Sequence, residues 1–523
     1  MSKRTTQATK RLLPPDPAPA NYFLDRGFSD LGATAKHSLK ATADDAVDLL
    51  RRAKGWLSAT SDSILIRLAA AALFTCAGAV VAVFGPAIVL VLALLHAVAV
   101  AAGAAPQGIA AAAVGALDAA GARRRGVRGL CPVCKAPFTL PGYRCPSCGA
   151  IHYRLRPNKH GVLHHTCRCG QKLPCTRFGS NVPLTGGASF KRADLQAVCT
   201  NPAAPHPVEG TEARAVCIAL AGARSTGKTA FLNAAAYGIM RQAAPARGLF
   251  ATCGTGPAAL RERALLADYA AGEVSLTAES TDPSQPTAAP FTFRLEGPGL
   301  DPARIVHLMD VAGEAFVANA EHERQLHYGF ADGVVLMIDP MSIPQVGDAL
   351  RRRLGMVDAA GVGAEDPNRV LAALVAKMQD AAETPAGSPL TVPLAVVLGK
   401  IDQAGLARFF DADAQRALLA RDASLSPADA HDALCRAFLA DHGMGNFLNA
   451  VDARFKTARF FACSAIGHAR GSGPYAPVGV AEPLDWILRQ SDPALAKALA
   501  LAAPVAAASS AAAAAPAAPT RAA

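Results

Sequence analysis

The stretch that decides the fold is Gly222-Ala223-Arg224-Ser225-Thr226-Gly227-Lys228-Thr229. It fits GxxxxGK[ST], in which a glycine-rich turn directs backbone N–H groups at the phosphates of a nucleotide. The apolar run 215–221 before it predicts a buried strand, and the run 230–237 after it predicts a helix whose N-terminus adds a partial positive charge. We therefore predict a phosphate-binding loop in which Lys228 reaches the β- and γ-phosphates and Thr229 ligates Mg²⁺.

A second motif, DxxG, follows the apolar run 305–309 as Asp310-Val-Ala-Gly313. In nucleotide-hydrolysing proteins with a P-loop, an aspartate at the end of a neighbouring strand helps to hold the magnesium ion. Asp310 is the candidate for this role, through a water molecule. The N–H of Gly313 is the candidate contact to the γ-phosphate.

Two motifs near the end of the domain predict which base is bound. The strand-like run 394–398 leads into KxD at Lys400 and Asp402, and the run 459–463 ends in Ser464-Ala465. A carboxylate at Asp402 accepts two hydrogen bonds from guanine N1 and N2, a pair that adenine cannot donate, so GTP is favoured over ATP. All four motifs follow strands in sequence, and the carboxyl ends of strands are where open α/β sheets bind ligands.

On these motifs, residues 213–490 resemble a TRAFAC-class P-loop GTPase. With the cysteine-rich module upstream, the chain resembles the bacterial double-GTPase group. The resemblance implies an α/β domain over residues 211–492, with a mostly parallel sheet flanked by helices and with GTP and Mg²⁺ as ligands. It also implies a protein partner, a second GTPase, in a conflict or defence system.

The motifs depart from the family pattern at several positions. Glu314 follows the DxxG glycine, where many GTPases have the glutamine that orients the attacking water. Gly399 replaces the Asn or Thr that usually precedes the base-stacking lysine, and Ile466 replaces a common lysine. Arg224 either points to solvent or lies near the γ-phosphate as an arginine finger. We therefore predict slow intrinsic hydrolysis, in which Lys228, Glu314 and Arg224 are the catalytic candidates.

The switch threonine that would complete the magnesium site is less defined. Thr277, Thr281 and Thr287 all lie in the expected segment, and Thr281 is preferred as a ligand beside Thr229 and Asp310. The predicted nucleotide contacts are Gly222, Ala223, Arg224, Ser225, Thr226, Gly227, Lys228, Thr229, Asp310, Gly313, Lys400, Asp402, Ser464 and Ala465.

Composition predicts disorder at both ends and a reducing environment. The 523 residues suffice for about three domains. Residues 1–60 form a basic N-terminal region that we expect to be partly disordered, and the Ala/Pro-rich tail 493–523 cannot bury much apolar area. The first long apolar run begins too late for a signal peptide. The cysteines cluster at metal-like spacings, which favours the cytosol over a disulfide framework.

Within residues 61–120, the sequence from 64 to 105 is almost continuously apolar. It is too long for one span of about 20 residues. Gly85-Pro86 in its middle predicts a tight turn between two membrane spans, 64–84 and 87–105. A single kinked span and a buried soluble hairpin are the alternatives. Basic residues on both flanks place the zinc-ribbon and GTPase modules at the cytoplasmic face of the inner membrane.

Residues 121–210 predict a zinc-ribbon module. Two CxxC pairs separated by ten residues, Cys131/Cys134 and Cys145/Cys148, predict one tetrahedral Zn²⁺ site with four thiolates. An iron centre also fits four thiolates. A second zinc site is predicted, and its ligands are Cys167, Cys169, Cys199 and His206, with Cys175 as the substitute for His206.

Most of the chain's net charge of +11 belongs to this module, because residues 121–200 contain 14 Lys and Arg against one Asp. Such a surface suits anionic lipid headgroups or nucleic acid. Lipid and protein contacts are favoured, because the module directly follows the apolar segment and contains few aromatic residues for stacking on bases. The leading interpretation is a membrane-tethered GTPase switch. A non-hydrolysing nucleotide-binding scaffold and a nucleic-acid-sensing NTPase are the alternatives.

Overall fold

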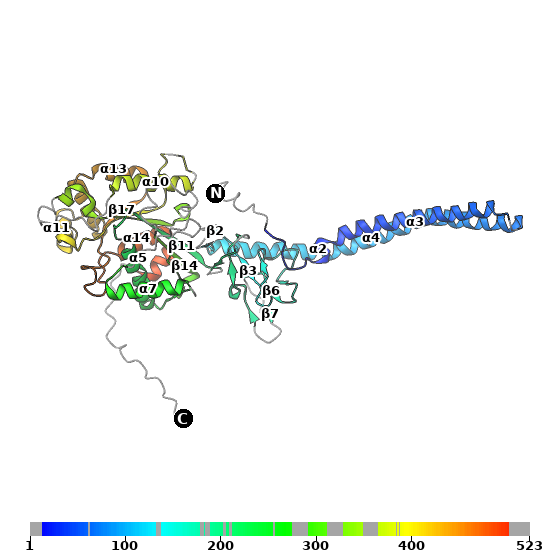
Figure 1. Cartoon of the computed structure of the whole chain (residues 1–523), viewed down its shortest axis with the longest axis horizontal. Coiled ribbons are helices and arrows are strands. Elements are labelled where there is room, and N and C mark those ends of the chain that lie inside the picture. The colour runs from blue at the N-terminus through cyan, green and yellow to red at the C-terminus, as the bar shows by residue number, and fades with distance from the viewer. Residues whose placement is uncertain are drawn as a thin grey trace, which may run out of the picture. The chain divides into compact units, whose positions relative to one another are not determined.

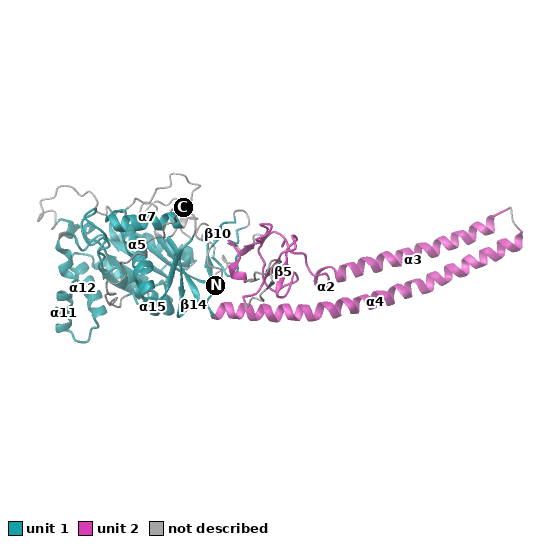
Figure 2. Ribbon diagram, turned by 90° about the horizontal axis from the view of Figure 1, so that it is seen from below, with its two compact units in different colours: residues 1–13, 125–141, 199–523 teal, residues 14–124, 142–198 magenta. Residues whose placement is uncertain are grey.

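The computed structural model describes residues 13–60, 63–131, 137–177, 182–183, 189–201, 205–208, 212–254, 257–274, 291–310, 328–348, 365–382, 384–385 and 387–501. The chain divides into two compact units, coloured separately in Figure 2. Unit 1 comprises residues 1–13, 125–141 and 199–523, and unit 2 comprises residues 14–124 and 142–198.

Unit 1 is built on a seven-stranded sheet with the order β12-β13-β14-β11-β15-β16-β17. Strands β14, β11, β15, β16 and β17 run parallel to one another, while β13 is antiparallel to both β14 and β12. The strands are β11 (Arg214–Gly222), β12 (Phe250–Cys253), β13 (Phe291–Gly297), β14 (Leu300–Asp310), β15 (Gly333–Ile338), β16 (Leu394–Leu398) and β17 (Ala458–Ala462). The α/β architecture predicted from the sequence is thus confirmed, and β11, which leads into the P-loop, lies centrally between β14 and β15.

Helices cover both faces of this sheet, so its central strands are apolar on both sides. Val216, Ile218 and Leu220 of β11 face one core, and the alternate residues Ala219 and Ala221 face the other, as the two-residue period of a strand requires. The first core includes α5 (Lys228–Tyr237), α7 (Pro257–Ala271), α14 (Ala481–Ser491) and α15 (Pro493–Leu499). The second includes α10 (Pro367–Ala382), α12 (Pro427–Asp441) and α13 (Gly445–Arg454).

Unit 1 extends beyond residue 492, where the predicted α/β domain ends. Helix α15 buries Leu495 and Leu499 in the first core. Asp492 caps this helix by accepting a hydrogen bond from the Leu495 N–H at 3.2 Å, and it pairs with the buried Arg304 of β14 at 2.7 Å. Burial opposes ionisation of Asp492, but hydrogen bonding and the charge of Arg304 hold its pKa below the usual value. The predicted disordered tail therefore starts too early, because residues 493–499 are helical.

In unit 2, two long helices run antiparallel beside each other after the short helix α2 (Tyr22–Asp25) (Figure 1). They are α3 (Gly27–Ser58) and α4 (Ile64–Arg124). Small residues set their spacing: a Cβ at Gly78 of α4 would lie 3.4 Å from the Ala46 carbonyl oxygen, and one at Gly85 would lie 3.1 Å from the Thr42 side chain. All of residues 27–58, which composition placed in a partly disordered region, form helix α3.

The predicted turn at Gly85-Pro86 is wrong, because α4 continues for 61 residues through both Pro86 and Pro106. A proline costs an interior helix about 3 kcal/mol, and the alanine- and leucine-rich sequence on either side favours continuation. The hairpin that does form joins α4 to α3. Helix α4 is long and apolar enough to cross a membrane, by length and composition alone, whereas α3 carries many charged side chains, among them Lys40, Asp44 and Arg51.

Short antiparallel strands follow α4 in unit 2. Strands β4 (Ile151–His152) and β9 (Ala197–Val198) pair with β3 (Gly142–Arg144), and β5 (His164–Thr166) pairs with β6 (Lys172–Pro174). The backbones of β7 (Val182–Pro183) and β8 (Ser189–Phe190) form another pair. In unit 1, β1 (Gly129–Leu130) pairs with β2 (Pro137–Phe138), and β10 (Pro207–Val208) follows.

Candidate functional site: a nucleotide site and two cysteine-rich clusters

The P-loop connects β11 directly to α5, and its backbone requires special conformations. Gly227 caps the helix in the left-handed region at φ 94°, and Ser225 also has a positive φ of 61°. A Cβ on Gly222 would lie 2.6 Å from the carbonyl oxygen of Met337, so only glycine lets β11 turn so close to β15. These conformations bring the turn and the N-terminus of α5 together, as anion binding requires.

Lys228 is buried and lies across this turn. Its Nζ donates to the carbonyl oxygens of Gly222 at 2.9 Å and Ala223 at 2.6 Å, and the Thr226 hydroxyl donates to the Ala223 oxygen at 3.0 Å. The ammonium group therefore sits beside the backbone groups that would bind phosphate. Arg224 is exposed on the turn, and its catalytic role stays a prediction.

The lysine and aspartate of KxD, Lys400 and Asp402, follow the carboxyl end of β16, and Ser464 follows the carboxyl end of the neighbouring strand β17. The Lys400 Nζ pairs with Asp339 Oδ2 at 2.7 Å, and the other oxygen of Asp339 accepts the Met341 N–H at the start of η4 (Pro340–Ser342). The Ser464 hydroxyl donates to Asp402 Oδ1, and the Gly467 N–H donates to that hydroxyl at 2.9 Å. Asp402 is exposed, so its carboxylate is held by Ser464 yet accessible to a ligand.

Gly399 explains one departure from the family pattern. Its N–H donates to the Ile338 carbonyl oxygen at 2.9 Å. A Cβ at this position would lie 3.3 Å from the backbone oxygen of Thr226 in the P-loop and 3.1 Å from Cε of Met337. The absence of a side chain at position 399 therefore lets the KxD segment pack directly against the P-loop.

Several predicted residues cannot be placed from side-chain geometry. Asp310 ends β14, with its backbone paired beside Leu220 of β11, so it lies at the same edge of the sheet as the P-loop. Gly313, Glu314 and Thr281 lie outside the described residues. The magnesium set of Thr229, Asp310 and Thr281 therefore stays a prediction, as does the contact of Ala465 with the base.

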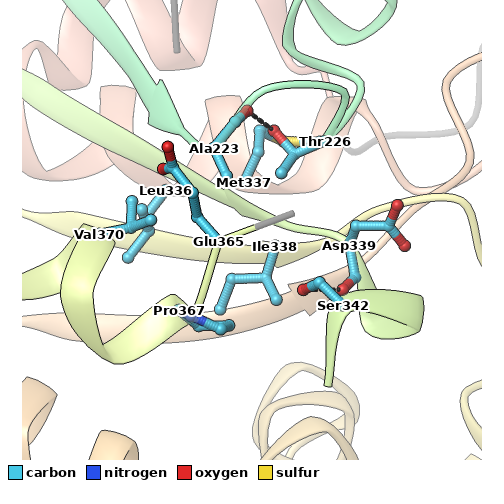
Figure 3. A pocket seen from close by; sticks show the side chains of 10 residues that line it. All are labelled: Ala223, Thr226, Leu336, Met337, Ile338, Asp339, Ser342, Glu365, Pro367 and Val370. Carbon is cyan, nitrogen blue, oxygen red and sulfur yellow. Dashed lines mark hydrogen bonds between the residues drawn. The ribbon is translucent and has the colours of Figure 1, made fainter. Parts of the chain in front are cut away.

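A small pocket opens beside the P-loop, at the end of β15 (Figure 3). Ala223 and Thr226 border it on the P-loop side, and Pro367 and Val370 border it at the start of α10. Its lining is largely apolar, so it does not itself suit phosphate. The Asp339 side chain that pairs with Lys400 also lines this pocket, so the pocket lies next to the residues predicted to bind the base.

Residues 216–439 match the family model Double-GTPase 2. The chain contains a GTPase of the P-loop class. The matched range covers most of the P-loop strand, DxxG and KxD, while Ser464-Ala465 lies beyond it. No curated protein matches the chain. Among solved structures, the signal recognition particle receptor SRb-GTP/SRX complex from Chaetomium thermophilum is similar to it, with 12% identity, 50% of this chain and 94% of that chain covered, and a TM-score of 0.21.

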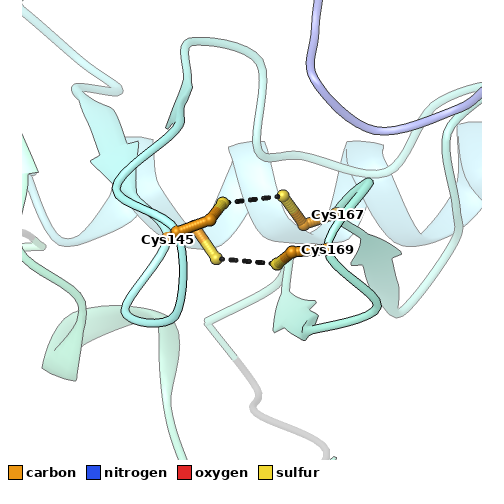
Figure 4. Close-up of side chains that lie close together, drawn as sticks. Cys145, Cys167 and Cys169 are labelled. Atoms are coloured by element: carbon orange, nitrogen blue, oxygen red, sulfur yellow. Dashed lines mark hydrogen bonds between the residues drawn. The ribbon is translucent and has the colours of Figure 1, made fainter.

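Unit 2 contains a cluster of four cysteines, Cys145, Cys148, Cys167 and Cys169. The sulfurs of Cys145 and Cys169 are 3.7 Å apart, and those of Cys148 and Cys167 are 3.6 Å apart. Figure 4 shows how two loops bring Cys145 close to Cys167 and Cys169. Tight turns at Gly149 and Gly170 form the loops. Burial raises the pKa of Cys167 to about 12, so a bound divalent cation would be needed to hold it as a thiolate.

Unit 1 contains a second cluster. The Nδ1 of His206 lies 3.9 Å from the Cys131 sulfur and 3.6 Å from the Cys199 sulfur. Cys134, three residues after Cys131, lies outside the described residues. The chemistry of both donor sets fits Zn²⁺, for which cysteine and histidine are the usual structural ligands.

The predicted membership of the two sites is therefore wrong. Cys145 and Cys148 group with Cys167 and Cys169, whereas Cys131 groups with Cys199 and His206. A CxxC turn presents two thiolates, but its sequence spacing does not determine which other turn faces it. Cys175, the predicted substitute ligand, belongs to neither cluster and donates to the Val162 carbonyl oxygen at 3.2 Å.

Sequence reasoning missed the partner of Lys400. Asp339 was recognisable only as the residue that closes the strand before Pro340. The signal available was a buried strand ending in an acidic residue at the same sheet edge as the other motifs.

Proposed function

We propose that the chain is a membrane-tethered GTP-binding switch that hydrolyses GTP slowly and acts with a protein partner. One observation carries the proposal: Lys228 and the base-reading pair Lys400 and Asp402 belong to segments that meet at the carboxyl edge of one sheet, where Gly399 packs against Thr226. Phosphate binding and guanine recognition then belong to a single site. Asp402 selects guanine, and Ser464 orients its carboxylate.

Slow turnover follows from the residues available for catalysis. Phosphoryl transfer depends mostly on positioning and on stabilising the charge of the transition state. Lys228 supplies one positive charge at the phosphates, and Arg224 is exposed. Glu314 takes the place of a water-orienting glutamine. A partner that contributes a further positive charge would raise the rate; by its resemblance to double-GTPase proteins, that partner is a second GTPase in a bacterial conflict or defence system.

The tether in this proposal is the apolar part of α4, whose leucine and valine side chains are largely exposed. Residues 64–105 extend about 60 Å in a helix, roughly twice the hydrocarbon thickness of a bilayer. Helix α3 covers one side of α4 with a charged sequence, so only the face of α4 turned away from α3 can meet lipid in this arrangement. We propose attachment to the cytoplasmic face of the inner membrane, with both cysteine clusters binding zinc.

Nucleotide binding by the full-length protein in detergent tests the site. We expect GTP to bind more tightly than ATP, Asp402→Asn to remove that preference, and Lys228→Ala to abolish both binding and turnover. Turnover of the wild type should lie well below 1 s⁻¹, the lower end of the range of efficient phosphoryl-transfer enzymes at roughly 1–100 s⁻¹. Equal affinity for ATP would refute guanine recognition, and GTP binding without any turnover would favour a scaffold.

Flotation with liposomes tests the tether. The full-length protein should float with anionic vesicles at high salt, where purely electrostatic attachment is lost. Substituting Leu73 and Val83, two exposed apolar residues of α4, by Glu should keep the protein at the bottom of the gradient. Labelling of Cys131 from outside intact cells would contradict the proposed orientation.

A further inference from the structure

Three polar side chains of unit 2 form a buried cluster apart from the cysteines. His152 ends β4, His165 lies within β5, and Asp16 belongs to the segment before α2. One potential ligand atom from each residue lies within 4.8 Å of the other two. Both histidines are fully buried, and the Asp16 side chain is only 2% exposed.

The hydrogen bonds around this cluster leave ligand atoms unused. Asp16 Oδ1 lies 3.0 Å from Nδ1 of His152, and His165 donates through Nε2 to the Arg156 carbonyl oxygen at 3.0 Å. That bond fixes the tautomer of His165 and leaves a lone pair on its Nδ1. Nδ1 of His165 and Oδ2 of Asp16 are buried without a hydrogen-bond partner among the described residues, and the nitrogen of His152 that faces Asp16 is Nδ1.

Unpaired buried atoms such as Nδ1 of His165 and Oδ2 of Asp16 are costly unless something binds them. Burying a polar group without a partner costs about 1–3 kcal/mol in proteins. Metal-bound histidines commonly donate their second nitrogen to a backbone carbonyl or a carboxylate, which fixes the ring for the ion. His165 shows this pattern with Arg156.

We propose that Asp16, His152 and His165 bind a third divalent metal ion, with zinc as the expected occupant. Two imidazoles and a carboxylate are a donor set suited to zinc. Either His160 or a water takes the fourth position. The ring centroid of His160 is 5.6 Å from that of His165, and its buried Nδ1 also has no hydrogen-bond partner among the described residues. The ion joins Asp16 to His152, which lies 136 positions later in the sequence. It thereby attaches the segment before α2 to strands β4 and β5.

Metal content of the full-length protein, measured by mass spectrometry after purification with zinc and desalting, tests the proposal. Two variants remove a ligand and keep the local hydrogen bond: His165→Gln retains an N–H for Arg156, and Asp16→Asn retains an oxygen for His152. The matched control is His164→Gln, because His164 is the adjacent residue of β5, is not part of the cluster, and points to the other side of the strand. We expect three equivalents per chain in the wild type and control, and one equivalent fewer in each variant.

Equal metal content in all four proteins would overturn the proposal and leave a hydrogen-bonded cluster, with water on the unused atoms. Cobalt substitution checks the cysteine clusters separately, because only thiolate-bound Co²⁺ gives intense charge-transfer bands, which the two variants should retain. If a variant loses these bands as well, it has lost its fold. The metal content of the wild type then decides, with its thiolate bands showing that both cysteine clusters are filled. Three equivalents per chain support the third site, and two equivalents overturn it. None of these outcomes depends on GTP binding.

Discussion

At the scale of single residues, Gly399 couples the two halves of the nucleotide site. Gly399→Asn restores the residue type usual in the family, yet we expect it to weaken the protein. Its Cβ would press on the Thr226 backbone oxygen at 3.3 Å. Overpacking of this kind costs about 1–3 kcal/mol. Thermal unfolding and GTP titration should show a lower melting temperature and no gain in affinity.

Gly445→Asn is the control for this substitution, because a Cβ at Gly445 meets no atom within 4 Å. It should leave both the melting temperature and the affinity for GTP nearly unchanged. Tighter GTP binding by Gly399→Asn would contradict the packing argument and would mean that the chain can accept the usual asparagine.

His431 gives the GTPase unit a dependence on pH. Its Nε2 accepts the Ala462 N–H of β17 at 3.1 Å, and its Nδ1 lies 3.1 Å from Gln415. Burial lowers its pKa against the opposing charges of Glu482 and Asp432, so the ring is neutral in the fold. In the unfolded chain histidine has a pKa of about 6.5. The stability it contributes is therefore complete above that pH and is lost as pH falls toward the lower pKa of the folded state.

The measurement is the free energy of unfolding at pH 7.5 and pH 5.5 for the wild type and His431→Gln. The wild type should lose more stability on acidification than the variant. The unfolded wild-type chain binds a proton at His431 at pH 5.5, whereas burial opposes that proton in the folded state. Equal losses would show that other groups account for the acid sensitivity.

At the scale of elements, the path of α4 could not be predicted from its composition. The sequence correctly indicated a long apolar helical segment, but Gly85-Pro86 suggested a turn because those residue types favour one in isolation. The packing of α3 on α4 decides otherwise, since Gly85 is the position where α3 approaches closely. A single sequence gives no direct signal for that contact, because α3 is charged and resembles a solvated helix.

A disulfide tests this pairing. Thr42→Cys with Gly85→Cys should cross-link readily under mild oxidation, because a Cβ at position 85 lies 3.1 Å from that of Thr42, close to the separation of about 3.5–4.5 Å in a disulfide. Mass spectrometry of the digested protein detects the linked peptides. Thr42→Cys with Phe84→Cys is the matched control, since Phe84 is exposed. Efficient cross-linking of the control pair, and not of position 85, would contradict the helix packing.

The loop after Ser464 depends on a second element, helix α7. The Tyr475 hydroxyl donates to the Glu273 carbonyl oxygen at 2.8 Å, and the Tyr475 N–H donates to the Tyr269 oxygen at 2.9 Å. Removing one such hydroxyl costs about 1 kcal/mol. Because Ser464 holds Asp402 from the same loop, Tyr475→Phe should weaken GTP binding a few-fold in calorimetry.

Tyr237→Phe is the control for that variant, because Tyr237 contacts Tyr269 through its ring, with centroids 3.6 Å apart, and the substitution keeps the ring. Its GTP affinity should match that of the wild type. If both variants bind GTP as the wild type does, the loop holds its position without α7.

The cysteine clusters show the same limit of sequence reasoning in another form. The sequence identified seven residues that the structure gathers into two groups, but it paired the CxxC turns by their order along the chain. The meeting of the P-loop, KxD and Ser464 at one sheet edge was easier to predict, because the carboxyl ends of parallel strands lie together. The binding of nucleotide by these residues stays a prediction. The Asp16, His152 and His165 group was not predictable from spacing, since its members come from distant segments. The TRAFAC assignment and the role of Glu314 stay predictions.

At the scale of the whole molecule, the chain alternates between its two units, so neither is a continuous stretch of sequence. Unit 2 includes residues 14–124 and 142–198, and unit 1 supplies the segment between them. A fragment beginning at Gly121 would therefore separate residues 142–198 from most of α4, although it keeps every cysteine of the two clusters. Experiments on isolated GTPase activity are better made with substitutions than with that truncation.

Asp118 of α4 is the residue that should hold the two segments of unit 2, residues 14–124 and 142–198, together. It pairs with Arg177 at 3.3 Å and Arg192 at 3.2 Å, and it accepts the Arg177 backbone N–H at 2.9 Å. Both arginine side chains are almost fully buried. Asp118→Asn leaves two buried guanidinium groups without this carboxylate, and breaking a buried ion pair costs about 3–5 kcal/mol.

Hydrogen exchange of the full-length protein is the measurement, because it reports on both units at once. Asp118→Asn should lower the protection of amides in residues 142–177, while strands β11, β15 and β16 and the affinity for GTP stay unchanged. Asp48→Asn is the control: its pair with Arg52 is exposed on α3, and such pairs are worth at most about 1 kcal/mol. If Asp118→Asn lowered protection equally in both units, the chain would unfold as one cooperative body, and the division into two units would not describe its stability.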